Sequence, residues 1–490
     1  MFRILSGSTQ AQPDTEAFLR LLNQSPEKIK NFFSSAQPLI VTRAPGRLDL
    51  MGGIADYSGS LVLQLPIAQA THAALQIQAG DELKIISLAA NVTQPARTFA
   101  MKLADSLADG KPISYAACHE KFKHNPNQQW VAYIVGAFLV LLRERGIKFT
   151  QGAAILIYSD VPEGKGVSSS AALEVAVMQA IVAAYKLKIT PPEIALLCQK
   201  VENLIAGAPC GVMDQMTSVL GERNELLALL CQPAEIQGTI KLPDELSVWG
   251  IDSGIRHSVG GADYGTVRTA AFMGYRMIAD IAGCAVTKAN SAGKVVIEDK
   301  KWHGYLANIL TGEFQKSYAA VLPEKLSGAE FLARYDGITD PVTAVNPDVI
   351  YPVLAATKHP IYEHARVKLF AEILQNWQDE NQARQLGNLM YQSHESYSTC
   401  GLGSPGTDEI VRLVREAGED SGLFGAKITG GGSGGTVAVL GHKDAAAVVQ
   451  SVAEKYAKST GHQPLILSGS SVGAKTFGSL LLSDDPAAWR

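Results

Sequence analysis

The stretch Asp160-Val-Pro-Glu-Gly-Lys-Gly-Val-Ser-Ser-Ser-Ala-Ala-Leu173 decides how the rest of the chain is interpreted. It follows an apolar run at 153–158 that predicts a buried strand, and it leads into residues 171–185, which predict a helix. Gly164 and Gly166 allow a tight turn and a close approach of the backbone to a ligand. Because the N–H groups at a helix start bind anions, this order predicts a phosphate site.

The serine triplet at 168–170 gives this loop hydroxyl groups for phosphate oxygens or a metal ion. The alternative is a structural loop in which one serine only caps the helix, since serine is a favoured N-cap. Two glycines together with three serines favour nucleotide phosphate. The stretch is not a Walker loop, because its Gly-Lys pair is not followed by Ser or Thr.

Composition limits the function classes. A chain of 490 residues is long enough for two or three domains, and we expect two. The net charge of −4 and the scattered Lys and Arg residues do not predict a nucleic-acid partner. Six separated cysteines without a C-x-x-C pair predict neither a zinc site nor a disulfide framework, and they fit a cytoplasmic protein. The start lacks a signal-peptide core and the longest apolar run, 130–142, is too short for a bilayer, so no membrane association is expected.

Further charged residues lie in loops and at helix ends, where functional groups often occur. A dense turn region at 44–60 holds Arg47 and Asp56. Glu202 lies on the flank of the apolar stripe of a predicted helix at 191–206, and a solvated surface residue is the better interpretation from spacing alone. Asp214 falls in the first turn of a predicted short helix, where a carboxylate also serves as a plain helix-stabilising charge.

Two other loops are weaker candidates. His257 lies in a glycine-punctuated loop at 253–264, but a lone loop histidine is more often structural. Gly430-Gly-Gly-Ser-Gly-Gly435 satisfies G-x-G-x-x-G, yet an apolar strand and not a helix follows it. A dinucleotide fingerprint needs the opposite context. We therefore predict that this cluster approaches a phosphate or the other glycine loop.

Three blocks together resemble the motifs of GHMP kinases: Arg43-Ala-Pro-Gly-Arg47, Pro162 to Leu173, and Lys427 to Gly435. Cys210-Gly-Val-Met-Asp-Gln215 and Asp56-Tyr57 extend the resemblance to the galactokinase branch, over most of residues 39–477. The resemblance implies an α+β fold of two lobes with the active site between them. It divides the chain into an N-terminal extension (1–36), an N-terminal domain (37–240) and a C-terminal domain (241–490).

The resemblance also implies roles for individual residues. ATP phosphates would lie on the loop, at Gly164, Gly166, Val167, Ser168, Ser169, Ser170 and Ala171. Mg²⁺ would be held by Ser170 and Glu202, Asp214 and Arg47 would be catalytic, and the sugar would contact Asp56, Gly211, Asp214 and Tyr264. These residue types suit phosphoryl transfer, which needs positioning, charge neutralisation and a carboxylate that accepts the hydroxyl proton.

The chain departs from galactokinases at Gly53 and Ile54, where that family usually has Glu and His for the exocyclic hydroxymethyl of the sugar. A buried hydroxyl without a partner costs about 1–3 kcal/mol, which is enough to change substrate preference. Galactopyranose without that arm is L-arabinopyranose, and residues 51–60 and 251–264 resemble L-arabinokinases most closely. The hypothesis is ATP-dependent phosphorylation of L-arabinose at its anomeric hydroxyl, with no protein partner. The alternatives are a galactokinase and a GHMP-type sugar sensor.

Overall fold

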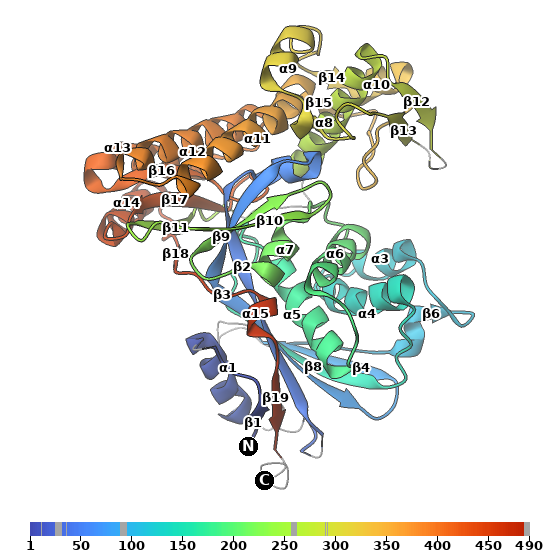
Figure 1. Ribbon diagram of the computed structural model, residues 1–490. Coiled ribbons are helices and arrows are strands. Elements are labelled where there is room, and N and C mark those ends of the chain that lie inside the picture. The colour runs from blue at the N-terminus through green and yellow to red at the C-terminus, as the bar shows by residue number, and fades with distance from the viewer. Residues whose placement is uncertain are drawn as a thin grey trace.

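The computed structural model describes residues 1–10, 12–24, 32–35, 37–88, 96–255, 262–289, 291 and 293–484, without the side chains of 262 and 263. Two sheets with helices around them form the centre of the molecule (Figure 1). The large sheet lies in the lower part of that view, and the small sheet lies beside a stack of long helices in the upper part. The predicted α+β fold is confirmed.

Within the described residues, nine strands form the large sheet, and β3 is its organising strand. Strand β3 pairs with β2 along most of its length, with β9 at its start and with β8 at its end. The strands are β1 (Arg3–Ser6), β2 (Leu39–Met51), β3 (Leu61–Gln78), β4 (Glu82–Leu88), β5 (Arg97–Lys102), β8 (Gly152–Ser159), β9 (Glu225–Leu230), β10 (Glu235–Lys241) and β19 (Leu480–Ser483). The 3₁₀ turn η1 (Gly53–Ser58) joins β2 to β3.

Helices cover both faces of this sheet because β3 alternates its side chains between them. Ala73 and Leu75 face a core under α5, whereas Ala74 faces the core under α1. The helices over the first face are α3 (Tyr115–Lys123), α4 (Val131–Arg145), α5 (Ser169–Ala184), α6 (Pro191–Val201), α7 (Met213–Leu220) and α15 (Ala474–Phe477), and α1 spans Pro13–Gln24. Thr42 ties β2 to α5, because its hydroxyl donates to the Ala176 carbonyl at 2.7 Å.

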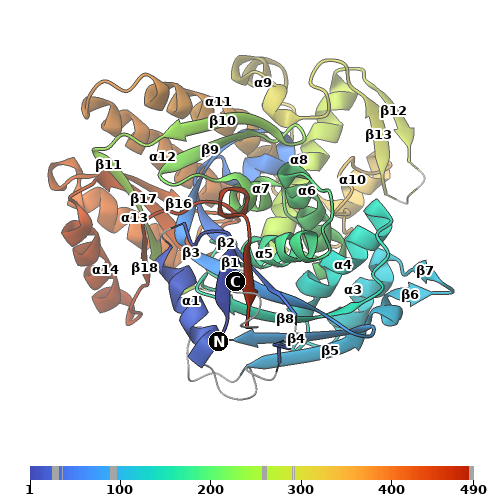
Figure 2. The same cartoon turned by 60° about the horizontal axis from the view of Figure 1, so that its bottom comes forward.

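The small sheet packs against the large one through a shared core. Its strands are β11 (Leu246–Asp252), β16 (Leu423–Ile428), β17 (Thr436–His442) and β18 (Ile466–Ser468). One face meets β2 and β3, where Leu48 and Leu65 join Val248 and Leu440 in one buried cluster. The other face carries α13 (Pro405–Ala417) and α14 (Ala446–Thr460), and α12 (Asn381–Thr399) lies along β16 (Figure 2).

A third cluster of elements lies beyond η1, around the long helices α8 (Ala262–Ile281) and α11 (Val353–Gln375). Arg268 of α8 is buried here and forms a two-pronged ion pair with Asp340, with both N–O distances at 2.8 Å. The short elements between α8 and α11 in the chain are β12 (Ala285–Lys288), β13 (Val295–Glu298), η4 (Leu306–Asn308), α9 (Thr311–Ser317), β14 (Leu326–Ser327), α10 (Gly328–Arg334) and β15 (Ile350–Tyr351).

Short elements elsewhere in the chain are β6 (Leu107–Ala108) and β7 (Lys111–Pro112), the 3₁₀ turns η2 (Leu103–Ser106) and η5 (Glu419–Ser421), and the π-turn η3 (Glu202–Ala206).

Two expectations on local structure change. Residues 44–51 are not part of a turn: β2 continues to Met51, because both faces of the strand are buried, and Arg47 therefore lies on a strand. The sequence also predicts a first helix at 15–33. The structure has α1 at Pro13–Gln24, residues 25–31 lie outside the described residues, and residues 32 and 33 are not helical.

The domain limits near residues 36 and 240 stay a prediction. The chain passes from the large to the small sheet between Lys241 and Leu246. The last strand, β19, returns to the large sheet and pairs with both β1 and β2. The described N-terminal and C-terminal ends therefore lie on the same sheet edge.

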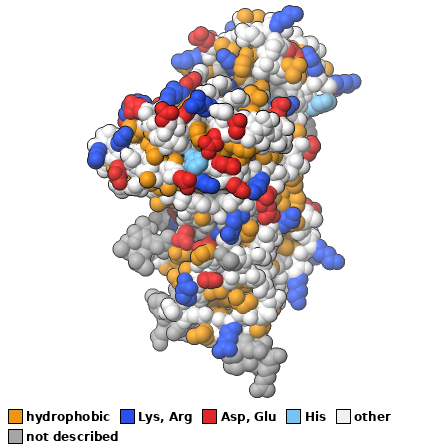
Figure 3. Space-filling view, turned by 60° about the vertical axis from the view of Figure 1, so that its left-hand side comes forward, with side chains coloured by type: hydrophobic (Ala, Val, Ile, Leu, Met, Phe, Trp, Pro, Cys, Tyr) orange, Lys and Arg blue, Asp and Glu red, His pale blue; other side chains and the backbone are white. Residues whose placement is uncertain are grey.

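The surface that carries α13 and α14 has mixed charge. Figure 3 shows acidic and basic side chains interspersed over this face. Several of them pair, such as Arg412 with Glu409 and Arg384 with Glu419. Exposed pairs of this kind contribute little to stability. Among the described residues, no helix is both long and apolar enough to cross a bilayer.

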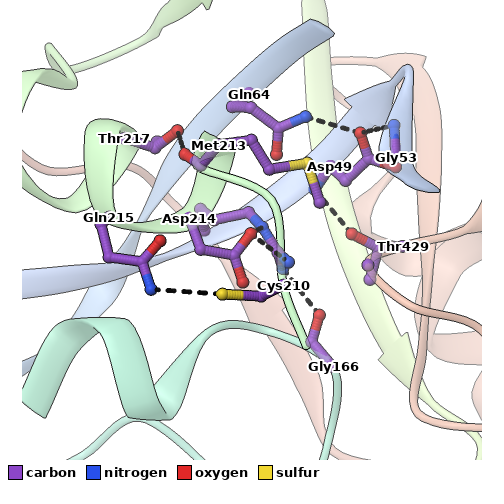
Figure 4. Close-up of polar contacts among 12 residues, drawn as sticks. Asp49, Gly53, Gln64, Gly166, Cys210, Met213, Asp214, Gln215, Thr217 and Thr429 are labelled. Carbon is purple, nitrogen blue, oxygen red and sulfur yellow. Dashed lines mark hydrogen bonds and ion pairs between the residues drawn. The ribbon is translucent and has the colours of Figure 1, made fainter. Parts of the chain in front are cut away.

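A buried ion pair joins the two sheets. The Lys427 ammonium on β16 lies 2.5 Å from the Asp49 carboxylate on β2, and both side chains are fully buried. The Asp49 carboxylate also accepts hydrogen bonds from the Gly53 N–H at 2.9 Å and from Gln64 at 2.6 Å (Figure 4). Asp49 therefore fixes the start of η1 relative to both sheets.

Removing the cation of this pair should destabilise the protein strongly. We expect Lys427→Met to lower the free energy of unfolding by about 3–5 kcal/mol, because Asp49 is left buried without its counter-ion. Urea unfolding followed by circular dichroism measures the loss. Lys241→Met is the control, since Lys241 pairs with Asp244 on the surface, and it should leave stability unchanged. Equal effects of the two variants would contradict the role of the buried pair.

Candidate active site

The phosphate loop connects β8 to α5 with three residues in the left-handed region. Gly164, Gly166 and Ser168 have φ values of 71°, 71° and 61°. The Ser168 hydroxyl makes no cap bond to α5, and its oxygen is buried without a hydrogen-bond partner in the described structure. Ser168 is the N-cap residue of α5, but its side chain does not cap the helix, so its hydroxyl is available to a ligand.

A cavity of about 230 Å³ opens beside this loop. It gathers most of the residues that the sequence singled out, from segments far apart in the chain. The predicted residues that line it are Arg47, Asp56, Gly164, Gly166, Ser168, Ser169, Ser170, Glu202, Gly211, Asp214 and Tyr264. Val167 and Ala171 do not line it, because both side chains are buried in the core, and only their backbone could serve a ligand.

Arg47 connects the phosphate loop to the Asp214 carboxylate. Its Nε and Nη2 donate to Asp214 Oδ1 at 3.0 and 2.7 Å, and its Nη1 donates to the Gly166 carbonyl at 2.7 Å (Figure 4). Its backbone N–H also donates to the Val167 carbonyl at 3.1 Å. Asp214 is in the first turn of α7, and its side chain is 18% exposed, so it faces the cavity while Arg47 is buried beneath it.

The second glycine cluster packs against the phosphate loop, as predicted. A Cβ on Gly430 would lie 2.7 Å from the Gly166 carbonyl oxygen and 3.2 Å from Arg47 Nη2. Such contacts are closer than side chains tolerate, so only glycine fits. The Thr436 hydroxyl, at the start of β17, donates to the Lys165 carbonyl at 2.8 Å. The late glycine turn thus holds the phosphate loop from the small sheet.

Glu202 and Ser170 meet at the loop end of the cavity. Glu202 lies in the π-turn η3 (Glu202–Ala206) after α6, and it lines the cavity together with Ser170. Gln215 donates to the same carboxylate at 2.6 Å. Burial raises the Glu202 pKa to about 7; the nearby Ser170 hydroxyl opposes this rise, and the charge of Asp214 reinforces it. A carboxylate with a hydroxyl beside it fits the hard oxygen ligands of Mg²⁺.

Asp56 lies at the other end of the cavity, in η1. Its Oδ1 is buried without a hydrogen-bond partner in the described structure. Burial, followed by the charge of Asp214, raises its pKa to about 7, and Arg268 opposes this rise. A Cβ on Gly211 would lie 1.8 Å from Asp56 Oδ2, so glycine is required there. An unpartnered carboxyl oxygen beside a glycine suits a small polyhydroxylated ligand.

Aromatic and apolar side chains form the rest of this end. Tyr264, the predicted sugar contact, is buried and lies edge-on to Tyr57, with ring centroids 6.0 Å apart. Ile54 also lines the cavity. Asp56 therefore faces one apolar wall and one aromatic wall.

The sequence pointed to no individual role for several residues that line or support the site. Tyr133, Ala208, Cys210 and Met213 line the cavity, together with Gly431 of the predicted glycine cluster. Arg268 donates to the Cys210 carbonyl at 3.1 Å, next to Gly211, and has no motif that marks it. A second groove of about 320 Å³ continues from the loop past Tyr133 and Trp130. His257 lies outside the described residues.

Family models match three parts of the chain. The model of the GHMP kinases N terminal domain matches residues 132–222, and that of the GHMP kinases C terminal matches 369–458. A galactokinase galactose-binding signature matches 29–77. The first of these models contains the phosphate loop, and the second contains the glycine cluster at 430–435.

Similar proteins include two kinds of sugar kinase. L-arabinokinase from Arabidopsis thaliana is 44% identical over 98% of this chain, and the chain spans about half (52%) of its length. Galactokinase from Actinobacillus succinogenes is 30% identical over 86% of this chain and 91% of its own.

Solved structures share the fold. Lactococcus lactis galactokinase complexed with galactose has a TM-score of 0.68 at 19% identity, covering 92% of this chain and 99% of that one. Methanococcus jannaschii mevalonate kinase has a TM-score of 0.54 at 14% identity, covering 88% and 98%. These two likenesses concern the fold alone. The galactokinase match over 86% of this chain, together with the three family models, shows that the chain belongs to the GHMP kinase family, in the group that contains the galactokinases.

Proposed function

We propose that this chain is an ATP-dependent sugar 1-kinase that phosphorylates the anomeric hydroxyl of L-arabinose. The observation that carries the proposal is the Asp214 carboxylate, which Arg47 holds beside the phosphate loop and in the same cavity as Asp56. A proton acceptor, a phosphate cradle and a sugar-binding carboxyl are thereby within one site. The likeness to L-arabinokinase from Arabidopsis thaliana supports the choice of sugar.

In the proposed reaction, Asp214 accepts the proton of the anomeric hydroxyl while that oxygen attacks the γ-phosphorus of ATP. The bond between the γ-phosphorus and the β,γ-bridging oxygen breaks, and ADP leaves. Both hydrogen bonds from Arg47 go to Oδ1, so we assign Oδ2 to the sugar hydroxyl. The guanidinium orients the carboxylate and offsets charge on the transferred group.

Mg²⁺ would be held by Glu202 and Ser170, and it would neutralise charge on the phosphate oxygens. The hydrogen bond from Gln215 orients the Glu202 carboxylate toward the cavity. Ser168 and Ser169 are placed to donate to phosphate oxygens from the loop. We assign the nucleoside to the neighbouring groove, where the Trp130 ring has the Arg97 guanidinium 5.3 Å from its centroid.

The sugar end supports a neutral pentose. Asp56 offers its unpartnered Oδ1 to sugar hydroxyls, and Tyr264 supplies a ring beside it. Ile54 lines the cavity with an apolar side chain and gives no hydrogen bond to an exocyclic hydroxymethyl. L-arabinose lacks that group, whereas galactose carries it.

Two other functions stay open to test. A galactokinase is supported by the galactokinase relatives and by the signature at 29–77. A sugar sensor of the same fold would not need the Arg47–Asp214 pair, so the retained pair favours an enzyme. All six cysteines are unpaired, which supports a reducing compartment such as the cytoplasm.

Asp214→Asn should keep the fold and lower kcat by about 10²–10⁴-fold, because an amide cannot accept the hydroxyl proton. ADP release in the presence of L-arabinose measures turnover, and circular dichroism measures folding. Asp244→Asn makes the same chemical change at an exposed position and should retain full activity. Wild-type turnover in Asp214→Asn would remove this carboxylate from the mechanism.

The substrate assignment predicts a clear preference among aldoses. We expect kcat/KM for L-arabinose to exceed that for D-galactose by tenfold or more, since the apolar wall leaves the galactose hydroxymethyl without a partner. Initial rates at saturating ATP, with each sugar varied, measure the ratio. A ratio in favour of galactose would replace the proposal with its alternative.

Asp56→Asn should stabilise the protein in a pH-dependent way. Asp56 ionises near pH 4 when unfolded and near pH 7 when folded, so its contribution to stability is present below pH 4 and is lost as the pH rises to 7. Asparagine removes this loss. The variant should therefore gain up to about 4 kcal/mol over wild type at pH 8, and much less at pH 4, while its KM for the sugar rises.

Urea unfolding of both proteins across pH 4–8 measures the gain. Asp244→Asn again serves as the control and should show no gain over this range. A difference between Asp56→Asn and wild type that does not change with pH would mean that Asp56 is ionised in the folded protein throughout the range.

A further inference from the structure

Gly53 is held against the hydroxyl of Tyr397. A Cβ on Gly53 would lie 1.6 Å from Tyr397 Oη and 2.8 Å from Asp49 Oδ2. The φ of Gly53 is +45°, which disfavours any L side chain independently of the space. The Tyr397 hydroxyl therefore occupies the volume that a side chain at position 53 would need.

The same hydroxyl connects the sugar end of the site to the phosphate end. It accepts a hydrogen bond from the Ile54 N–H at 2.9 Å and donates one to the Gly430 carbonyl at 3.0 Å. Ile54 belongs to η1 and lines the cavity, whereas Gly430 packs on the phosphate loop beside Arg47. Tyr397 itself comes from α12 and is fully buried.

Packing fixes the tyrosine in this position. Its ring lies in the same apolar cluster as Ile54, Leu402 and Ile428. The His359 ring meets it edge-on at 5.2 Å, and the Lys427 ammonium lies 5.3 Å from its centroid. Because the ring is enclosed on these sides, Ile54 cannot move back into the core, and the apolar wall of the cavity is rigid.

We propose that Tyr397 is a positioning residue that sets sugar specificity. It excludes a side chain at position 53 and holds Ile54 as a fixed wall of the cavity. The site therefore admits a pentopyranose but not the homologue that carries a hydroxymethyl group. This inference rests on the proposed function. The position of Ile54, the apolar wall of the cavity, is determined by Tyr397, which does not itself line the cavity. Changing Gly53 or Ile54 alone therefore does not convert the site.

The test is a double-mutant cycle of Gly53→Ala and Tyr397→Leu, with kcat/KM measured for L-arabinose and D-galactose. Gly53→Ala alone should lower kcat/KM for L-arabinose at least tenfold, because its Cβ meets the tyrosine hydroxyl. Tyr397→Leu should lower the arabinose-to-galactose ratio about tenfold, since Ile54 can then retreat. The double variant should lose much less relative to Tyr397→Leu than Gly53→Ala loses relative to wild type, because the tyrosine contact is gone while the positive φ and the contact with Asp49 remain.

Tyr391→Leu is the matched control, since Tyr391 lies on the same helix but on the Arg415 side, where the guanidinium is 4.3 Å from its ring centroid. It should leave the sugar ratio unchanged. If Tyr397→Leu does not fold, Tyr397→Phe keeps the ring and removes only the hydroxyl. Its KM for L-arabinose should rise and the ratio should fall about threefold.

Additive losses in the double variant, or an unchanged ratio in folded Tyr397→Leu or Tyr397→Phe, would overturn the inference. A wild-type protein that prefers D-galactose would overturn the proposed substrate, and with it the size limit assigned to the wall. The exclusion of a side chain at position 53 by Tyr397 could still be tested. The coupling between Gly53→Ala and Tyr397→Leu can be calculated from kcat/KM values for any sugar that the protein phosphorylates.

Discussion

The site depends on one guanidinium that hydrogen-bonds to two segments at once. Arg47 donates to the Asp214 carboxylate and to the Gly166 carbonyl, and these groups belong to α7 and to the phosphate loop. Because a guanidinium is planar and its donors point in fixed directions, the carboxylate and the loop cannot move independently. Lysine could not replace it, since a single ammonium does not define the angle between two acceptors.

Close backbone approach is the condition that makes this arrangement possible. A Cβ on Gly46 would lie 2.5 Å from the Val167 carbonyl, and one on Gly430 would lie 2.7 Å from the Gly166 carbonyl. The phosphate loop is therefore enclosed by β2 on one side and by the glycine turn before β17 on the other. Gly46, on β2, is required by a neighbour far away in the sequence, and Gly430 is required both by such a neighbour and by its own φ of 71°.

Local pattern predicted the strand, loop and helix at 153–185 well, because apolar periodicity and glycines are properties of the segment itself. It failed for Arg47, which lies on β2, because the burial of that strand on both faces depends on the small sheet. Glu202 and Asp214 were weak candidates from spacing and became candidates through the family resemblance. Their position in one cavity is supplied by the structure.

Support residues were harder to predict than the residues they support. Gly53 and Ile54 were noticed as departures from a motif, but the reason for glycine is the Tyr397 hydroxyl on a helix near the other end of the chain. Arg268 and Asp340 gave no local signal, because an ion pair leaves no mark in either segment alone. Sequence reasoning therefore finds the groups proposed to contact ligands and misses those that hold them in place.

Several carboxyl groups are buried close together in and around the site, and their mutual repulsion is only partly compensated. Burial raises the pKa of Asp56, Glu202 and Glu174, and neighbouring carboxylates raise all three further. Arg47 also binds the phosphate loop and Arg268 is paired with Asp340, so the two guanidinium groups oppose these pKa rises only in part. A divalent cation at Glu202 would favour the ionised carboxylate and strengthen the fold, since a ligand that binds only the native state stabilises it. The carboxyl groups that weaken the isolated protein are thus the ones that suit the proposed cationic cofactor and hydroxylated substrate.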